Sequence, residues 1–130
     1  MPQTPDNRTA GSFSLHRKRI FVAGPCGMVG SALVRRLMRE DCTILVVARR
    51  EVDLRCQLDV ERWFARYRPD TVLVAAGTVG GMFANDARPV PFLYDNLMIA
   101  ANVIAAAHDS GVEKLLYLGS SCIYPRAVDQ

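Results

Sequence analysis

The chain has 130 residues, of which 50% are hydrophobic and 22% are charged, and it carries a formal net charge of +3. This is an ordinary globular composition, and the length suits a single domain. The positive charge is mild and scattered, whereas a nucleic-acid surface needs a clustered basic stripe. We therefore expect no nucleic-acid partner.

Membrane, secretion and metal-binding classes are also disfavoured. No continuous apolar run reaches the roughly 18–20 residues that span a bilayer, so we expect no membrane partner. Residues 1–18 lack the apolar core of a secretory signal. We predict a disordered tail there and a cytoplasmic location, with an organelle transit peptide as the minor alternative. The 4 cysteines include no C-x-x-C pair, so free thiols and no metal site are expected.

Apolar runs and helix-spaced stripes alternate along the rest of the chain. The predicted strands cover residues 19–24, 42–48, 51–54, 71–77 and 114–121, and the third of these is very short. The predicted helices cover residues 28–38, 59–67 and 91–110, with a loop rich in glycine and asparagine before the last. Such alternation implies right-handed parallel βαβ units. We predict an α/β fold, a Rossmann-like doubly wound parallel sheet of about five strands in the order 3-2-1-4-5.

The segment GPCGMVG, residues 24–30, follows the first predicted strand and opens the first predicted helix. In a dinucleotide-binding turn, Gly24 would form the tight turn, Gly27 would admit a pyrophosphate, and Gly30 would let the helix pack on the sheet. The helix amino terminus would offer free N–H groups to the phosphates. The strand-to-helix context favours nucleotide binding over the alternative, a purely structural turn.

The second predicted strand ends in ARRE, residues 48–51. An NAD-binding fold usually places an acidic residue there for the ribose 2′-hydroxyl. Arg49 and Arg50 can instead bind a 2′-phosphate through their guanidinium groups, which favours NADP(H) over NAD(H). Two alternatives stay open: the arginines are merely solvated, or Glu51 accepts from a 2′-hydroxyl in a shifted register.

Further strand ends should meet at the same crevice, because ligands of open α/β sheets bind outside the carboxyl ends of the strands. DLRC, residues 53–56, is expected near an adenine ring, and AAG, residues 75–77, lies at the end of the next strand. GSSCIYP, residues 119–125, is the most polar of these ends. Its hydroxyls could bind a sugar carbonyl, and the Cys122 thiol could exchange an acidic carbon-bound proton. The alternative is an inert buried cysteine.

Four longer segments of the chain carry a recognisable pattern: IFVAGPCGMVGSALVRRL, VGGMFAN, FLYDNLMIAANVIAAAH and KLLYLGSSCIYP. Together they resemble the GDP-L-fucose synthase family of extended short-chain dehydrogenases. The resemblance covers about residues 18–126. It implies NADPH-dependent 3,5-epimerisation and 4-reduction of GDP-4-keto-6-deoxy-D-mannose, a nucleotide-sugar substrate, and pairing of two copies through the long helix at 91–110.

The resemblance also implies roles for single residues. The cofactor contacts carried over are Gly24, Gly27, Met28, Val29, Gly30, Arg49, Leu118, Gly119 and Ser121. Ser120 matches the catalytic serine that polarises the 4-keto oxygen, and Cys122 matches the cysteine that acts as base in the epimerisation. Asn96 matches an asparagine that braces the sheet beside the cofactor.

The chain departs from the family pattern at several positions. The family usually has His-Arg in place of Pro25-Cys26, a lysine in place of Thr78, and a carboxylate in place of Cys56. Neither of the two lysines, Lys18 and Lys114, follows a tyrosine at Tyr-x-x-x-Lys spacing, so the proton donor of the reduction is missing.

Residues 19–130 are therefore expected to form an incomplete NADP-binding domain without the substrate domain. This domain would bind the dinucleotide but would not turn over alone. The alternatives are a non-catalytic nucleotide-binding remnant or interaction module, or part of another NAD-dependent sugar-nucleotide epimerase or dehydratase.

Overall fold

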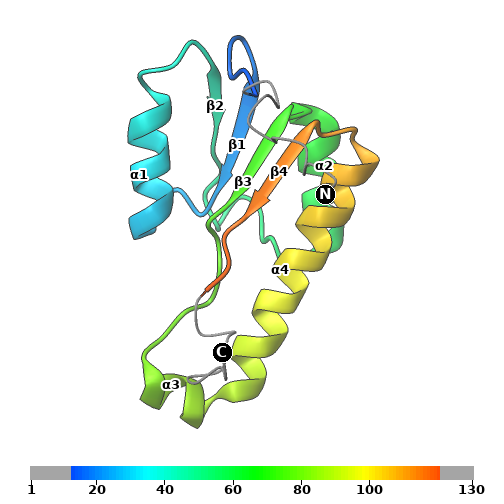
Figure 1. The fold of residues 1–130 in the computed structure, drawn as a ribbon. Helices are drawn as coiled ribbons and strands as arrows, with labels where there is room; N and C mark the ends of the chain where they lie inside the picture. Colours follow the sequence, from blue (N-terminus) through cyan, green and yellow to red (C-terminus); the bar gives the residue numbers. More distant parts are fainter. Residues whose placement is uncertain (1–12, 121–130) are drawn as a thin grey trace, which may run out of the picture.

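Four parallel strands lie at the centre of the computed structural model, which describes residues 13–120 (Figure 1). The strands are β1 (Arg19–Ala23), β2 (Thr43–Leu45), β3 (Thr71–Val74) and β4 (Lys114–Tyr117). The helices are α1 (Met28–Leu37), α2 (Gln57–Tyr67), α3 (Met82–Ala87) and α4 (Pro89–Asp109). Strands and helices alternate along the chain, which is the arrangement of a Rossmann-like α/β fold.

The strand order across the sheet is β2-β1-β3-β4, and each pair is parallel. This is the predicted order with the third predicted strand left out. The chain order reverses between β1 and β3, where Ile20 pairs with Thr71 and Ala23 with Val74. That reversal is the topological switch point of a doubly wound sheet, the place where such folds bind ligands.

The central strand β1 is buried on both faces because alternate residues supply two separate cores. Phe21 and Ala23 pack with α2 and α4, and Trp63 stacks against Phe21 with ring centroids 4.1 Å apart. Ile20 and Val22 pack on the other face with Leu37 of α1. Helices therefore cover both faces of the sheet, with α1 on one side and α2 and α4 on the other (Figure 1).

The very short strand predicted at residues 51–54 is not formed, so the described sheet has four strands rather than about five. The backbone turns there instead, because the N–H groups of Glu51 and Val52 both donate to the carbonyl oxygen of Ala48. The Asp53 side chain then accepts from the N–H of Arg55 at 3.0 Å. Local hydrogen bonds of this kind compete with strand pairing.

Other predicted boundaries also shift. The strand predicted at 42–48 pairs with β1 only over Thr43–Leu45. The loop predicted before the long helix contains α3. The long helix starts at Pro89 and ends at Asp109, followed by Gly111 at a φ of +71°, as expected of a glycine that ends a helix.

The amino-terminal segment adds contacts to the sheet before β1 begins. Leu15 packs on the core beneath α1, and the N–H of Arg17 donates to the carbonyl oxygen of Asp41 at 2.7 Å. Lys18 pairs with Glu113 at 2.5 Å. Residues 1–12 lie outside the described part of the chain, and the disordered tail at 1–18 stays a prediction.

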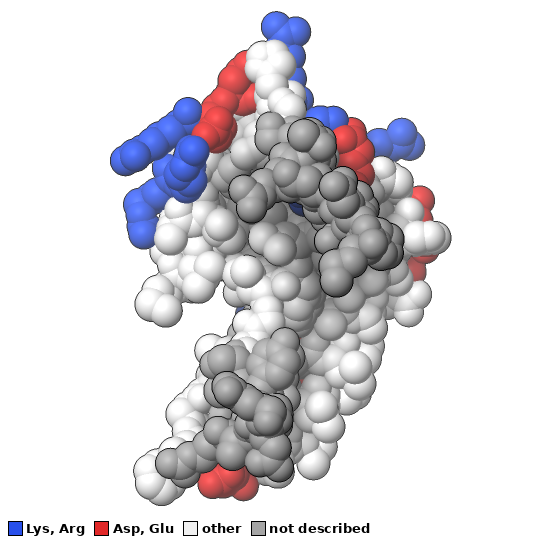
Figure 2. Space-filling view, in the orientation of Figure 1, with Lys and Arg blue, Asp and Glu red and all other residues white. Residues whose placement is uncertain are grey.

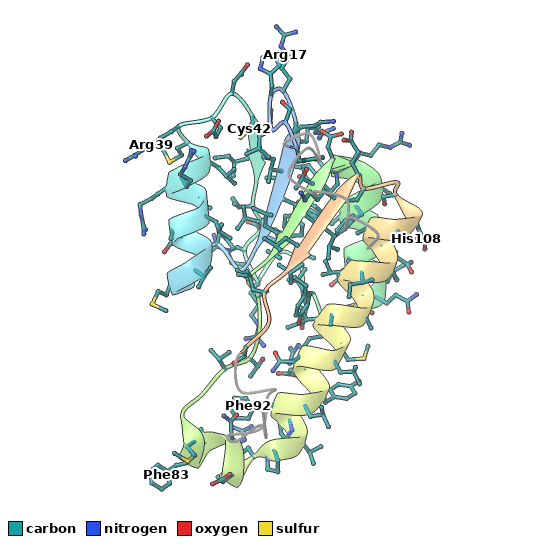
Figure 3. The ribbon with its side chains drawn as sticks, viewed as in Figure 1. Arg17, Arg39, Cys42, Phe83, Phe92 and His108 are labelled. Atoms are coloured by element: carbon teal, nitrogen blue, oxygen red, sulfur yellow. The ribbon has the colours of Figure 1, made fainter. Side chains whose placement is uncertain are left out.

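Helix α3 and the first turns of α4 project away from the sheet (Figure 1), and the described part of the face that Figure 2 shows is mostly uncharged there. Phe83 points outward at the tip and is 91% exposed, whereas Phe92 lies between the two helices (Figure 3). A Cβ on Gly80 would stand 2.9 Å from the Phe92 ring, so glycine there allows this packing. Within residues 13–120, only α4 is long and apolar enough to cross a bilayer by length and composition.

Candidate functional site

The glycine turn after β1 is fixed by close backbone contacts. Gly24 has a φ of +81°, and a Cβ there would stand 2.7 Å from the Cα of Ala76. A Cβ on Gly30 would stand only 1.9 Å from the carbonyl oxygen of Gly24. A side chain fits at neither position without movement of the backbone. The turn and the close packing of α1 therefore both depend on glycine, as predicted.

Gly27 differs from its two neighbours in the motif because a Cβ there would meet nothing closer than 3.7 Å. Packing within the chain therefore does not require a glycine at this position. Gly27 is instead the N-cap of α1 and makes no side-chain cap, and the first turn of the helix holds no acidic residue. The amino terminus of α1 is thus uncapped and carries the positive end of the helix dipole, which suits an anion.

A cleft of about 310 Å³ opens beside this turn, at the carboxyl ends of β1, β2 and β3. Its volume lies at the lower end of the range of small-molecule sites, roughly 300–1,000 Å³. The lining is mostly apolar, with few polar groups. It comprises Gly24, Pro25, Cys26, Gly27, Val47, Ala48, Arg49, Val52, Asp53, Leu54, Arg55, Ala75, Ala76, Gly77, Thr78 and Ile99. The cleft therefore lies at the switch point of the sheet, where a dinucleotide is expected.

The predicted cofactor residues divide into those that line the cleft and those that do not. Gly24, Gly27 and Arg49 line it. Gly30 is buried behind the turn, and Met28 and Val29 are 87% and 44% exposed at the start of α1. Arg50 follows Arg49 but is not part of the described lining. Cys26 is exposed and lines the cleft beside Pro25, so the unusual pair faces the site.

The predicted residues at the end of β4 lie apart from the described cleft lining. Leu118 continues the pairing with β3, since its N–H donates to the carbonyl oxygen of Val74 at 3.1 Å. Gly119 and Ser120 follow it and are exposed. Ser121 and Cys122 lie outside the described residues. Both Ser120 and Cys122 therefore stay predictions as catalytic residues.

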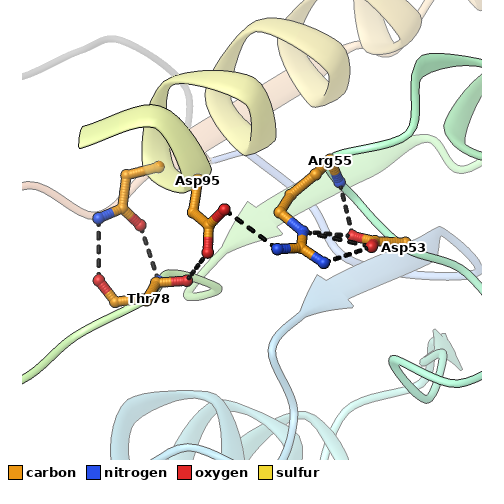
Figure 4. Close-up of polar contacts among 5 residues, drawn as sticks. Asp53, Arg55, Thr78 and Asp95 are labelled. Carbon is orange, nitrogen blue, oxygen red and sulfur yellow. Dashed lines mark hydrogen bonds and ion pairs between the residues drawn. The ribbon is translucent and has the colours of Figure 1, made fainter. Parts of the chain in front are cut away.

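Sequence reasoning missed a network of polar and charged side chains (Figure 4), three of which, Asp53, Arg55 and Thr78, line the cleft. Arg55 donates through its Nη2 to Asp53 at 2.7 Å and through its Nη1 to Asp95 on α4 at 3.1 Å. Thr78 in turn donates its hydroxyl to Asp95 at 3.0 Å. The residues come from three separate segments, and only the Asp53–Arg55 pair is close in sequence.

The network holds both carboxylates in their charged form. Hydrogen bonds from Arg55 lower the pKa of Asp53 to about 2, against the desolvation that acts to raise it. Hydrogen bonds from Arg55 and then Thr78 likewise lower the pKa of Asp95, and both carboxylates also feel the charge of Arg49. The pKa of Arg55 is raised by Asp53 and Asp95. Asp53 thus presents a fixed anion at the end of the cleft.

Asn96 clamps the loop that follows β3. Its Oδ1 accepts from the N–H of Thr78 at 2.7 Å, and its Nδ2 donates to the carbonyl oxygen of the same residue at 2.9 Å. Gly77 packs tightly beside this clamp, since a Cβ there would stand 3.1 Å from the Asn96 Oδ1 and would press on it. The amide therefore fixes the backbone that forms one wall of the cleft, in agreement with the bracing role that the resemblance implied.

Comparisons with known proteins find related chains. The model of the NAD dependent epimerase/dehydratase family matches residues 20–130. A GDP-L-fucose synthase from Sinorhizobium fredii is 51% identical over 118 residues, which cover 91% of this chain and 38% of the relative. The GDP-L-fucose synthase of Escherichia coli is 46% identical over 117 residues, covering 89% of this chain and 36% of the relative. The chain thus spans less than two-fifths of the length of these relatives.

Solved structures share the fold. A GDP-mannoheptose C4 reductase from Campylobacter jejuni, determined with NADP bound, superposes with a TM-score of 0.82 at 35% identity. The match covers 87% of this chain and 36% of that one. A GDP-L-fucose synthetase from Naegleria fowleri bound to NADP superposes with a TM-score of 0.75 at 24% identity, covering 91% of this chain and 35% of that one, which supports the fold.

Proposed function

Because the chain belongs to the NAD-dependent epimerase/dehydratase family, we propose that it binds NADP(H) as the cofactor-binding part of a GDP-L-fucose synthase-type enzyme. The substrate would be a GDP-linked 4-keto-6-deoxy sugar, as the family resemblance implies, and the names of the relatives support a GDP-sugar. The 130-residue chain alone would bind the dinucleotide without reducing the sugar, since it contains no Tyr-x-x-x-Lys pair.

The observation that carries the proposal is the free space beside Gly27 at the uncapped start of α1. Gly24 and Gly30 are needed by the chain's own packing, whereas the room at Gly27 faces the cleft. Backbone N–H groups at that helix end can donate to a pyrophosphate. A glycine that packing does not require, placed at such a terminus, suits the close approach of a phosphate to the backbone.

Arg49 would supply the second part of the cofactor site. It lines the cleft at the end of β2 and is exposed, so its guanidinium can reach a ligand. A 2′-phosphate would bind there through paired N–H donors, and this contact would favour NADP(H) over NAD(H). Arg50, which is not part of the described cleft lining, would attract the 2′-phosphate over a longer distance.

The reacting end would lie toward the carboxyl end of β4. NADPH, when bound, supplies a hydride. The Ser120 hydroxyl would donate a hydrogen bond to the keto oxygen of the sugar, and the Cys122 thiolate would remove and return carbon-bound protons. Pairing of two copies through α4 and a cytoplasmic location remain predictions.

Titration of the full 130-residue chain with NADPH, followed by nucleotide fluorescence, tests the proposal. We expect binding in the micromolar range, about −8 kcal/mol, and weaker binding of NADH. The variant Gly27→Ala should keep the fold by circular dichroism and lose affinity. Absence of NADPH binding at millimolar concentration would overturn the proposed cofactor binding. Reduction of the keto-sugar by the 130-residue chain alone would overturn the proposal that this chain does not catalyse the reaction.

A further inference from the structure

The strongest unexplained feature is Arg55, which lines the cleft and bridges the carboxylates of Asp53 and Asp95 (Figure 4). It meets Asp53 side-on, with its Nε 3.0 Å from Oδ1 and its Nη2 2.7 Å from Oδ2. It meets Asp95, 40 positions further along the chain, through Nη1. The guanidinium therefore ties the turn after β2 to the amino-terminal half of α4.

The turn that carries Arg55 is also attached to the rest of the molecule by a hydrogen bond and by apolar packing. The Nδ2 of Asn102, buried in α4, donates to the carbonyl oxygen of Leu54 at 3.0 Å. Val52 and Leu54 pack on the core beneath the turn. The Arg55–Asp95 pair is thus a second attachment to α4, on the side where Asp53 lines the cleft.

Charge balance decides what Arg55 can do. Its single positive charge faces the negative charges of Asp53 and Asp95, so these three side chains together are anionic. A net negative group of this kind disfavours a phosphate directly beside Arg55. The Nε, Nη1 and Nη2 of Arg55 also already donate hydrogen bonds to these two carboxylates. Its chemistry is that of an internal support rather than of a phosphate ligand.

We propose that Arg55 is a positioning residue, which sets the base end of the dinucleotide cleft by fixing Asp53 and the turn at residues 51–56 against α4. This inference rests on the proposed function and extends it to the base end of the ligand. Asp53, held in one orientation, can accept an N–H from a purine amino group. Fixing it before binding removes an ordering cost from the binding step.

The extension of the network to Thr78 supports this role. Asp95 accepts from the Thr78 hydroxyl, and Thr78 is also held through its backbone by Asn96. Both walls of the cleft, the turn after β2 and the loop after β3, are therefore fixed to α4 through neighbouring residues. Loss of the Arg55–Asp95 link should loosen the first wall and leave the second in place.

The test compares NADPH affinity in variants of the full chain. Arg55→Leu should weaken binding about tenfold, and Asp95→Asn should weaken it less, since the neutral amide still offers an oxygen to Arg55. The double variant should bind no worse than Arg55→Leu alone, because both changes break one link. Arg62→Leu, an exposed arginine of α2 outside the cleft lining, is the matched control and should bind normally.

Base selectivity separates positioning from a merely structural role. The wild type should bind NADPH more tightly than its hypoxanthine analogue, which lacks the amino group, and Arg55→Leu should lose most of this preference. Arg55→Lys should restore part of the affinity, because a cation between the carboxylates is retained. Arg55 is 35% exposed, so we expect its variants to fold, which thermal unfolding checks.

Two results would overturn the inference. In the first, Arg55→Leu binds NADPH like Arg62→Leu. In the second, affinity falls while the preference for the amino-bearing base stays at the wild-type level. Failure of the wild type to bind NADPH would overturn the proposed function, and this inference with it. Binding by the wild type without an Arg55 effect would overturn only the inference.

Discussion

Gly30 packs against Gly24 so closely that a Cβ on Gly30 would lie 1.9 Å from the Gly24 carbonyl oxygen. The substitution Gly30→Ala should therefore displace α1 from the turn and lower the free energy of unfolding by about 3 kcal/mol, a typical cost of overpacking. Urea unfolding at neutral pH measures this change. Gly81→Ala is the control, because nothing lies within 4 Å of a Cβ there. Equal stability of the two variants would contradict the predicted clash.

Gly27→Ala should separate folding from ligand binding. A Cβ at Gly27 would stand 3.7 Å from its nearest neighbour, the Gly24 carbonyl oxygen, so the free energy of unfolding should change by less than about 1 kcal/mol. Affinity for NADPH should nevertheless fall about tenfold, since the methyl group would occupy space that a pyrophosphate needs. Fluorescence titration measures the affinity. Undiminished binding would mean that no phosphate approaches the backbone at this residue.

Arg49→Ala should weaken NADPH binding about tenfold and leave NADH binding almost unchanged, because only NADPH carries the 2′-phosphate. Arg49 lines the cleft, whereas Arg50 is not part of the described lining, so Arg50→Ala should have the smaller effect. Parallel titrations with both nucleotides measure the ratio. A loss of equal size for NADH would assign Arg49 to another part of the ligand.

Cys26→Arg should strengthen NADPH binding severalfold, since a guanidinium beside Arg49 would add a second partner for the 2′-phosphate. Cys26 is exposed in the cleft, so the larger side chain has room. Met38→Arg adds the same charge at the other end of α1, where Met38 is 73% exposed, and serves as the control. A gain of the same size in that control would indicate general electrostatic attraction.

The stability of the chain should fall as the pH drops from about 4 to 2, in part through Asp53. Its pKa is lowered to about 2 by Arg55, below the usual value of 3.8, so the carboxylate stabilises the fold above that usual value and loses this effect on protonation. Because Asp53 is 36% exposed, we expect no more than about 1 kcal/mol. Urea unfolding of the wild type and Asp53→Asn against pH measures the difference. Parallel pH profiles would contradict this assignment.

The strand order and the glycine turn could be predicted because their signals are local. In β1, every residue from Ile20 to Ala23 is apolar, and the glycines at 24, 27 and 30 follow directly. The prediction of a strand at residues 51–54 was wrong because this short sequence is also compatible with a turn. The side-chain oxygen of Asp53, which accepts from the N–H of Arg55, favours the turn. Helix α3 was missed because glycine and asparagine around it are typical of loops.

The Arg55 network could not be predicted for a different reason. Asp95 lies 40 positions from Arg55, and only the packing of α4 beside the turn after β2 brings the two together. A single arginine in a polar segment carries no signal of a partner at that separation. Asn96, in contrast, was identified through the family resemblance, and its two hydrogen bonds to Thr78 agree with that role.

The central place of β1 has a consequence for the order in which the protein folds. Its first backbone N–H, at Arg19, donates to the carboxylate of Asp70 at 2.6 Å, across a separation of 51 positions. During synthesis, β1 is made about 50 residues before its neighbour β3. Long-range pairing of this kind slows folding. We expect chains that end before β3 to leave β1 without its central partner and to expose the apolar side chains on both of its faces.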